Sequence, residues 1–367
     1  MKTLKPKDGG SIPENPRLIA SWRGRLVLAR LSDDPHAWVM SEKGNPQGWN
    51  TQPIEDSDTA ATSGSLSLAG KPQDVINCLI PYSDDILIIG CDHSIWTLTG
   101  DPLLGGQIDL LADTTGISFG RPWTKDPRGN VFFFGSRGGV YALSPTGGPP
   151  QKLTESSIDR RMGDVDLAMY RLELVWNDRQ EGLYVYQVPY GSGGAAVRSW
   201  FWDRKRNAWW EDEFGSTSTQ PTSSLVIDGD SVDDRVMLVG GEDGIIRKYD
   251  AAAKSDDGAA IEARILIGPV VPKSGEGKNV RFSHLAVTLA SGQDGALARQ
   301  YVSDTADLTG DAVSESDVAP GRSSYQMARA KGGYYWVELA NASVNERFAF
   351  EAMSVRAYPA GRPGGGA

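Results

Sequence analysis

Short apolar runs that end in glycine and lead into a polar turn recur along the chain. The clearest copies are SDDILIIGCDHSIWTLTG, PRGNVFFFGSRGGVYALSPTG and DDRVMLVGGEDGIIRKYD, whose runs end at Gly90, Gly135 and Gly240. A looser copy, WRGRLVLARLSDDPHAWVMS, precedes them. These runs are too short for helices, and the turn leads each run into a second strand. Each copy therefore predicts a β-hairpin.

The spacing of these hairpins indicates a repeated sheet. Gly90 and Gly135 lie 45 residues apart, close to the ~40 to 50 residues of a propeller blade. The 105 residues between Gly135 and Gly240 leave room for one further blade. Its strands are predicted in MYRLELVWND, GLYVYQVPY, VRSWFWDRK and NAWWEDEF. Because an isolated hairpin is marginal in water, four-stranded sheets that share a core are the stable arrangement.

Changes in the sequence pattern divide the chain into predicted regions. Residues 1–14 are predicted as an N-terminal arm, 15–250 as a β-propeller-like domain, 251–260 as a linker, and 359–367 as a disordered tail. Residues 261–358 carry further strands without the glycine signature and are predicted to form a sandwich or irregular blades. The fold class predicted is all-β, with a propeller-like main domain and additional C-terminal antiparallel strands.

Charge and hydropathy limit the classes of partner that the chain is expected to bind. A net charge of -10 repels a phosphate backbone, so tight non-specific nucleic-acid binding is not expected. No apolar stretch approaches 18 residues and no apolar run follows the first lysines, so neither a membrane partner nor a secretory signal is expected. With the hairpin turn placed at Ser83 and Asp84, Cys78 faces Ile89 and is only a diagonal neighbour of Cys91. That geometry argues against a disulfide between the two cysteines. The low number of cysteines is typical of a protein made in a reducing cytosol.

Few residues suggest catalysis. His36, His93 and His284 stand in separate segments without metal-binding spacing, and no nucleophile elbow or phosphate loop occurs. The acidic groups around residues 211–213 and 228–234 are interpreted as solvated hairpin ends, with a calcium site as the alternative for the second. The sequence thus predicts no catalytic residue, no cofactor and no metal ligand. A pair of carboxylates that the fold brings together from distant blades for sugar hydrolysis remains an open alternative.

Exposed apolar and aromatic positions provide the candidate contacts instead. In RSWFWDRKRNAWWEDEF, Trp200 and Trp202 with one of the later pair are expected to pack across a hairpin, while the basic turn at 204–206 stays in water. Interface packing and base stacking are the alternatives. The loops DPLLGG and VPYGSGG display further apolar side chains. The candidate interface residues are Leu103, Leu104, Tyr190, Trp49, Trp209 and Trp210.

Residues 15–250 contain phrases that resemble tail nozzle or tail tubular-type proteins, which are structural proteins at the head-tail junction of short-tailed bacteriophages. The matching residues are Gly24-Arg25-Leu26-Val27-Leu28, Ser41, Gly44-Asn45-Pro46 and Trp49. The phrases DDILIIGCDHSIWTLTGDP and GISFGRPWTKDPRGNVFFFGSRGGVYALS are also similar to that family.

The resemblance implies a virion structural protein that is made in the host cytoplasm and is not an enzyme. Copies of the chain would form a ring, dock on other tail or adaptor proteins, and line or close a conduit through which genomic DNA passes. The alternatives are a propeller-type enzyme that acts on polysaccharide, and a carbohydrate- or protein-binding module.

Overall fold

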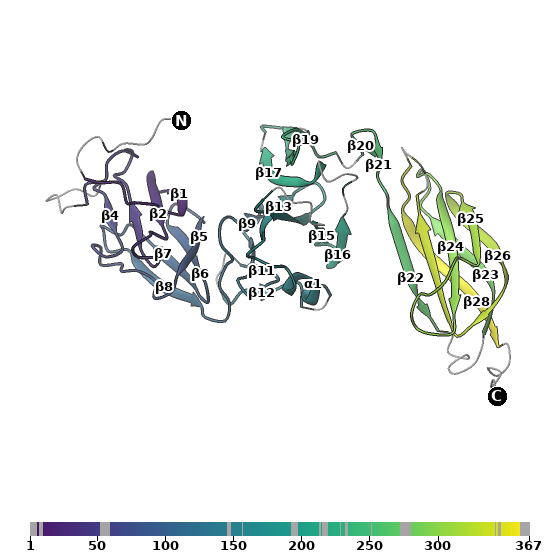
Figure 1. Cartoon of the computed structure of the whole chain (residues 1–367). Coiled ribbons are helices and arrows are strands. Elements are labelled where there is room, and N and C mark those ends of the chain that lie inside the picture. The colour runs from purple at the N-terminus through teal and green to yellow at the C-terminus, as the bar shows by residue number, and fades with distance from the viewer. Residues whose placement is uncertain are drawn as a thin grey trace. The chain divides into compact units, whose positions relative to one another are not determined.

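A computed structural model describes residues 6, 10–51, 59–144, 148–155, 157–191, 197–212, 214, 219–227, 229–231, 234–250, 252–271, 280–341, 343 and 346–359 (Figure 1). The chain divides into two compact units. Unit 1 comprises residues 1–212 and 217–249, and unit 2 comprises residues 213–216 and 250–367. Most of the predicted N-terminal arm and all but the first residue of the predicted tail lie outside the described residues.

The described residues of unit 1 form five antiparallel sheets in chain order, here called blades 1 to 5. Blade 1 holds β1 (Leu18–Trp22), β2 (Arg25–Ala29), β3 (Trp38–Met40) and β4 (Thr62–Ser63), and blade 2 holds β5 (Ile76–Pro81), β6 (Ile86–Cys91), β7 (Ile95–Thr99) and β8 (Gln107–Ala112). Blade 3 holds β9 (Trp123–Lys125), β10 (Val131–Phe134), β11 (Val140–Leu143) and β12 (Gln151–Lys152). Blade 4 holds β13 (Tyr170–Asn177), β14 (Gly182–Pro189), β15 (Ser199–Asp203) and β16 (Ala208–Asp212), and blade 5 holds β17 (Pro221–Ile227), β18 (Val236–Gly241) and β19 (Ile246–Lys248). A short helix, α1 (Asp159–Gly163), lies between blades 3 and 4 in the chain.

Successive blades of unit 1 bury apolar side chains against one another. One core joins blades 1 and 2 through residues such as Trp38 and Ile89, and a second joins blades 2 and 3 through Ile80 and Phe133. A third core joins blades 3 and 4, where Phe132 and Trp200 are buried. The first strands of neighbouring blades also touch, as β1 does β5, β9 does β13, and β13 does β17. Unit 1 is therefore propeller-like, as the sequence predicts.

Two of the glycines that end the apolar runs lie where the structure leaves no room for a side chain. A Cβ atom added to Gly90 would lie 2.6 Å from the Cβ of Ile117, which is fully buried between blades 2 and 3. At Gly135 an added Cβ would lie 2.6 Å from the Tyr141 ring. Real Cβ atoms essentially never approach so closely. Lack of space is therefore the main constraint on Gly90 and Gly135.

Unit 2 is a β-sandwich with a two-stranded hairpin at its start. One sheet contains β22 (Arg264–Val270), β27 (Tyr334–Ala340), β24 (Ala296–Ser303) and β25 (Ser314–Val318), and the other contains β26 (Gly321–Gly332), β23 (Val280–Leu289) and β28 (Phe350–Pro359). Both sheets contribute side chains to one core, including Phe282 and Tyr335, whose rings stack at 4.6 Å. The segment expected to be a linker instead forms the hairpin of β20 (Ser255–Asp256) and β21 (Ala259–Ala260), because Asp257 and Gly258 adopt the positive φ that a tight turn needs.

The hairpin of blade 2 differs by one residue from its predicted register. Its turn uses Ser83, Asp84 and Asp85, so Cys78 pairs with Gly90 and not with Ile89. Cys91 pairs with Ile76, and both cysteines are free and buried, in agreement with the predicted absence of a disulfide. Within the described residues, no helix is both long and apolar enough to cross a membrane.

Candidate functional site

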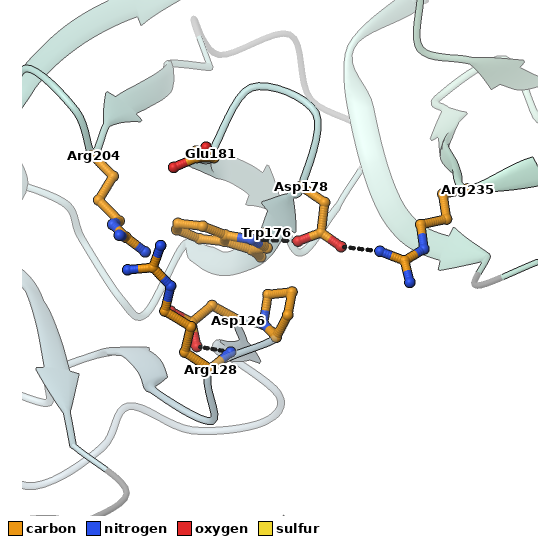
Figure 2. Close-up of a pocket in the computed structure, with 8 residues that line it drawn as sticks. Asp126, Arg128, Trp176, Asp178, Glu181, Arg204 and Arg235 are labelled. Carbon is orange, nitrogen blue, oxygen red and sulfur yellow. Dashed lines mark hydrogen bonds and ion pairs between the residues drawn. The ribbon is translucent and has the colours of Figure 1, made fainter. Parts of the chain in front are cut away.

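A cleft of about 230 Å³ opens at one end of blades 3 and 4 and is here called the interblade cleft (Figure 2). It is lined by Asp126, Pro127, Arg128, Trp176, Asp178, Glu181, Arg204 and Arg235. The β9–β10 turn contributes the first three, and the β13–β14 and β15–β16 turns of blade 4 contribute Asp178, Glu181 and Arg204. An antiparallel sheet places its first-to-second and third-to-fourth turns at the same end, which is why residues far apart in sequence meet here.

Trp176, the penultimate residue of β13, fixes the inner wall of the cleft. Its side chain is 5% exposed, and its ring stacks on that of Phe132 in blade 3 with centroids 5.2 Å apart and planes 4° apart. Its indole N–H donates a hydrogen bond of 2.7 Å to Asp178. Aromatic stacking of this kind contributes about 0.5–1.5 kcal/mol beyond area burial. The wall is therefore rigid and presents an aromatic edge.

The three carboxylates of the cleft already have partners. Asp126 accepts hydrogen bonds from the backbone N–H groups of Arg128 (3.0 Å) and Asn130 (2.8 Å) and from the Asn130 side chain (2.7 Å). Asp178 accepts the indole N–H and lies 3.8 Å from a guanidinium nitrogen of Arg235. Glu181 forms an ion pair of 3.1 Å with Lys205. The carboxylates thus order the turns around the cleft.

Two guanidinium groups of the cleft lack such partners. Arg128 and Arg204 point toward one another beside Trp176 (Figure 2). Among the described residues, no hydrogen bond or ion pair joins either guanidinium to a protein acceptor. By contrast, the neighbouring Arg206 pairs with Asp203 at 2.6 Å. The positive charge at this point of the cleft remains available to a ligand.

The residues singled out from the sequence lie elsewhere. Leu104, Tyr190 and Trp210 are 69%, 54% and 49% exposed, while Leu103 is partly buried. Trp209 is also partly buried, and its indole N–H donates to the Leu153 carbonyl at 3.2 Å. Trp49 is only 1% exposed and belongs to a core of blade 1, so it is not available to a partner.

The turns around the cleft share a pattern of residue types in the sequence. Four turns carry aspartate and arginine in close succession: DPRGN at 126–130, DRQEG at 178–182, DRKRN at 203–207 and DR at 234–235. The basic turn at 204–206 was expected to lie wholly in water. In the structure Lys205 and Arg206 form ion pairs on the surface, whereas Arg204 lines the cleft.

Two other titratable sites, the β6–β7 turn and Asp212, lie outside the cleft lining. Asp74, Asp92 and His93 bring their ligand atoms within 4.8 Å of one another. Asp74 accepts hydrogen bonds from the His93 backbone N–H (2.7 Å) and the Ser94 hydroxyl (2.9 Å), so it holds the β6–β7 turn. Asp212 was expected in a solvated hairpin end, but it is partly buried, and burial raises its pKa to about 6.

Comparisons of the sequence with known proteins give no family. No protein-family model matches the chain, and no curated protein matches it.

Several solved structures match at low similarity. The extracellular domain assigned to a hybrid two-component system of B. thetaiotaomicron matches with a TM-score of 0.41 and 12% identity, over 89% of this chain and 36% of that chain. This chain thus spans about a third of that extracellular domain. The exo-beta-1,3-galactanase from Phanerochaete chrysosporium matches with a TM-score of 0.33 and 8% identity, over 97% of this chain and 98% of that chain. A glycoside hydrolase matches with a TM-score of 0.27 and 9% identity, over 92% and 96%.

These matches correct the phage-tail interpretation. The proteins found are extracellular domains of two-component systems and glycoside hydrolases, so the expected tail nozzle, DNA conduit and virion location are wrong. The expectation that the chain is not an enzyme is likewise overturned by the hydrolase structures. At such low identity and TM-score, the matches do not give this chain the activities of those proteins.

The residues that carried the resemblance serve the folding of blade 1. Arg25 is buried and donates hydrogen bonds to the carbonyls of Ser41 (3.0 Å) and Ala60. The Ser41 hydroxyl accepts the N–H of Leu26 at 2.9 Å, and the Trp49 indole N–H donates to the Pro46 carbonyl at 2.9 Å. Such contacts stabilise a hairpin and its flanking loop whatever the protein does. A motif of this kind therefore indicates a local fold and not a place in a phage tail.

Proposed function

We propose that the chain is a saccharide-binding propeller and that the interblade cleft holds the sugar. This agrees with the carbohydrate-binding alternative that the sequence left open. The observation that carries the proposal is the lining of the cleft, which combines one indole with three guanidinium groups and three carboxylates.

The lining favours a ligand that carries both hydrogen-bond donors and hydrogen-bond acceptors over its whole surface. Guanidinium groups only donate hydrogen bonds and carboxylates only accept them, whereas each sugar hydroxyl does both. A ring with several hydroxyls can therefore satisfy both kinds of group at once. An apolar ligand would leave the charged groups without partners at a cost of several kcal/mol. The aromatic edge of Trp176 suits the C–H surface of a sugar ring.

The volume of the cleft and the net charge of the chain also favour a saccharide as the ligand. A volume of about 230 Å³ is below the ~300 Å³ at which pockets for drug-sized ligands begin. One or two sugar rings, with the rest of a chain in solvent, fit this opening. A net charge of -10 disfavours nucleic acid as the ligand.

A screen of immobilised neutral and acidic oligosaccharides, followed by calorimetry on the hits, tests the proposal. We expect Glu181→Gln to weaken binding about tenfold, since a hydrogen bond to a charged group contributes about 1.5–3 kcal/mol. Glu242→Gln, in the exposed β18–β19 turn, is the matched control and should bind as the wild type does. Absence of any saccharide hit, or equal binding by Glu181→Gln, would contradict the proposal.

Glycoside hydrolysis is the second candidate, because Asp178 and Glu181 both line the cleft. Hydrolysis of a glycosidic bond generally uses a pair of carboxyl groups, one as acid and one as base or nucleophile. The two functions separate when the protein is incubated with a bound oligosaccharide. New reducing ends that disappear in Glu181→Gln would favour hydrolysis, and their absence from the wild type would favour binding alone.

A further inference from the structure

We infer that the interblade cleft selects a saccharide bearing a carboxylate or sulfate group, and that Arg128 and Arg204 hold that group. The inference rests on the proposed function, which it deepens by assigning the charge of the ligand. It concerns two residues that the folding of the cleft does not use as ion-pair partners.

The two arginines approach the cleft from different blades. Arg128 belongs to the β9–β10 turn of blade 3, and Arg204 begins the β15–β16 turn of blade 4. Their guanidinium groups converge in front of the Trp176 indole (Figure 2). A group held between them would therefore bridge the two blades at the mouth of the cleft.

The acids nearby form no hydrogen bond or ion pair with these two guanidinium groups in the part of the chain that the structure describes. Asp126 is occupied by three N–H donors, Asp178 by the indole and Arg235, and Glu181 by Lys205. In the part of the chain that the structure describes, the two guanidiniums have no acceptor of their own. Since like charges at close range repel, this arrangement is most stable when an anion lies between them.

The chemistry of arginine specifies the kind of anion. A guanidinium presents donors in a planar fork that matches the paired oxygens of a carboxylate or sulfate, and both oxygens can be bound at once. Arginine also stays charged at every accessible pH, so binding does not depend on its titration.

The backbone around both arginines is held in place before a ligand arrives. The Arg128 N–H donates to the Asp126 carboxylate at 3.0 Å, and the Arg204 N–H donates to the Glu181 carbonyl at 3.3 Å. Only the side chains then lose freedom on binding, which lowers the entropic cost of capturing the anion.

Calorimetry on the full chain with matched pairs of ligands tests the inference. The pairs are trigalacturonate with its methyl ester, a hyaluronan tetrasaccharide with its methyl ester, and a sulfated chondroitin disaccharide with its unsulfated form. Sodium sulfate alone is the fourth probe. We expect the charged member of at least one pair to bind about tenfold or more tightly, the effect of a charge-assisted bidentate contact.

The variants separate charge selection from folding. Arg204→Ala and Arg128→Ala should each remove most of this preference, and Arg204→Lys should restore only part of it because an ammonium lacks the planar fork. Arg137→Ala, in the exposed β10–β11 turn at the other end of blade 3, is the matched control and should keep the full preference. Circular dichroism and the thermal midpoint confirm that each variant is folded.

The outcomes distinguish the two proposals. Equal affinity for both members of every pair, with loss of binding in Glu181→Gln, would overturn the anion preference and leave saccharide binding standing. A preference unchanged in both alanine variants would also overturn it. Binding of sulfate as tight as that of the sulfated sugar, or of no saccharide at all, would overturn both proposals.

Discussion

Replacing Gly90 with alanine tests how the blades of unit 1 pack. The added Cβ would lie 2.6 Å from the Cβ and Cδ1 atoms of Ile117 and 2.7 Å from its Cγ1. Ordinary contact begins at about 3.4 Å, so a shift of nearly 1 Å is needed. Ile117 resists such a shift because its N–H donates to the Cys91 carbonyl at 2.9 Å and its carbonyl accepts from Asn77 at 3.2 Å.

The expected loss of stability follows from that geometry. Overpacking a core costs typically ~1–3 kcal/mol, and the anchored backbone of Ile117 places Gly90→Ala near the upper end. The smaller backbone entropy of alanine in the unfolded chain offsets about 0.4–1 kcal/mol of this loss. We therefore expect a net loss of roughly 2 kcal/mol, or a fall of about 1 M in the urea midpoint at ~2 kcal/mol/M.

Urea unfolding followed by tryptophan fluorescence is the assay. Unit 1 dominates this signal, because unit 2 contains only Trp336 of the 11 tryptophans. Gly191→Ala is the matched control, since an added Cβ there meets nothing within 4 Å, and its effect should stay within about 0.5 kcal/mol. Combining Gly90→Ala with Ile117→Ala should cost less than the sum of the single changes, by about 0.5–3 kcal/mol. A loss below about 0.5 kcal/mol for Gly90→Ala, or strict additivity, would refute the packing argument.

Two further predictions concern buried titratable groups. Because burial raises the pKa of Asp212 from 3.8 to about 6, the folded chain binds this proton more tightly than the unfolded chain, and stability should fall as pH rises between about 4 and 6. At 1.36 kcal/mol per pKa unit, the fall in the free energy of unfolding is about 3 kcal/mol. Urea midpoints compared from pH 4 to 8 should show this fall in the wild type and not in Asp212→Asn. A variant with the same pH profile as the wild type would count against the burial of Asp212. Burial also raises the pKa of the Cys78 and Cys91 thiols. Both should react with a thiol reagent only in urea, and rapid reaction of the native chain would contradict their position in the core.

The strands of blade 4 show what sequence alone can predict. The predicted segments contain β13, β14, β15 and β16 in order. The tryptophan-rich hairpin also packs as expected, with Trp200 and Trp202 in the core that joins blades 3 and 4. Local composition sufficed here, because short runs rich in aromatic and β-branched residues between polar turns favour strands.

The cleft was not predictable in the same way. Its residues come from separate turns, and their meeting depends on how blades 3 and 4 stack, which no local pattern encodes. The composition of each turn, as in the DPRGN segment around Arg128, is also what an ordinary solvated hairpin requires. Only the recurrence of aspartate and arginine at the same end of neighbouring blades distinguishes these turns.

The phage-tail interpretation was wrong because it relied on residues that form the fold. The residues behind the phage resemblance, such as Arg25, Ser41 and Trp49, stabilise blade 1 through hydrogen bonds. Fold-forming residues of this kind recur wherever the same hairpin occurs, so they are weak evidence of function. The guanidinium groups of Arg128 and Arg204, in contrast, close no turn among the described residues and line the cleft.

A crystal structure of the chain with the best-binding acidic oligosaccharide tests the central claim most directly. The account predicts a sugar ring against the edge of Trp176, with its charged group between Arg128 and Arg204. A saccharide bound anywhere else on the chain, with the interblade cleft filled only by solvent, would contradict it.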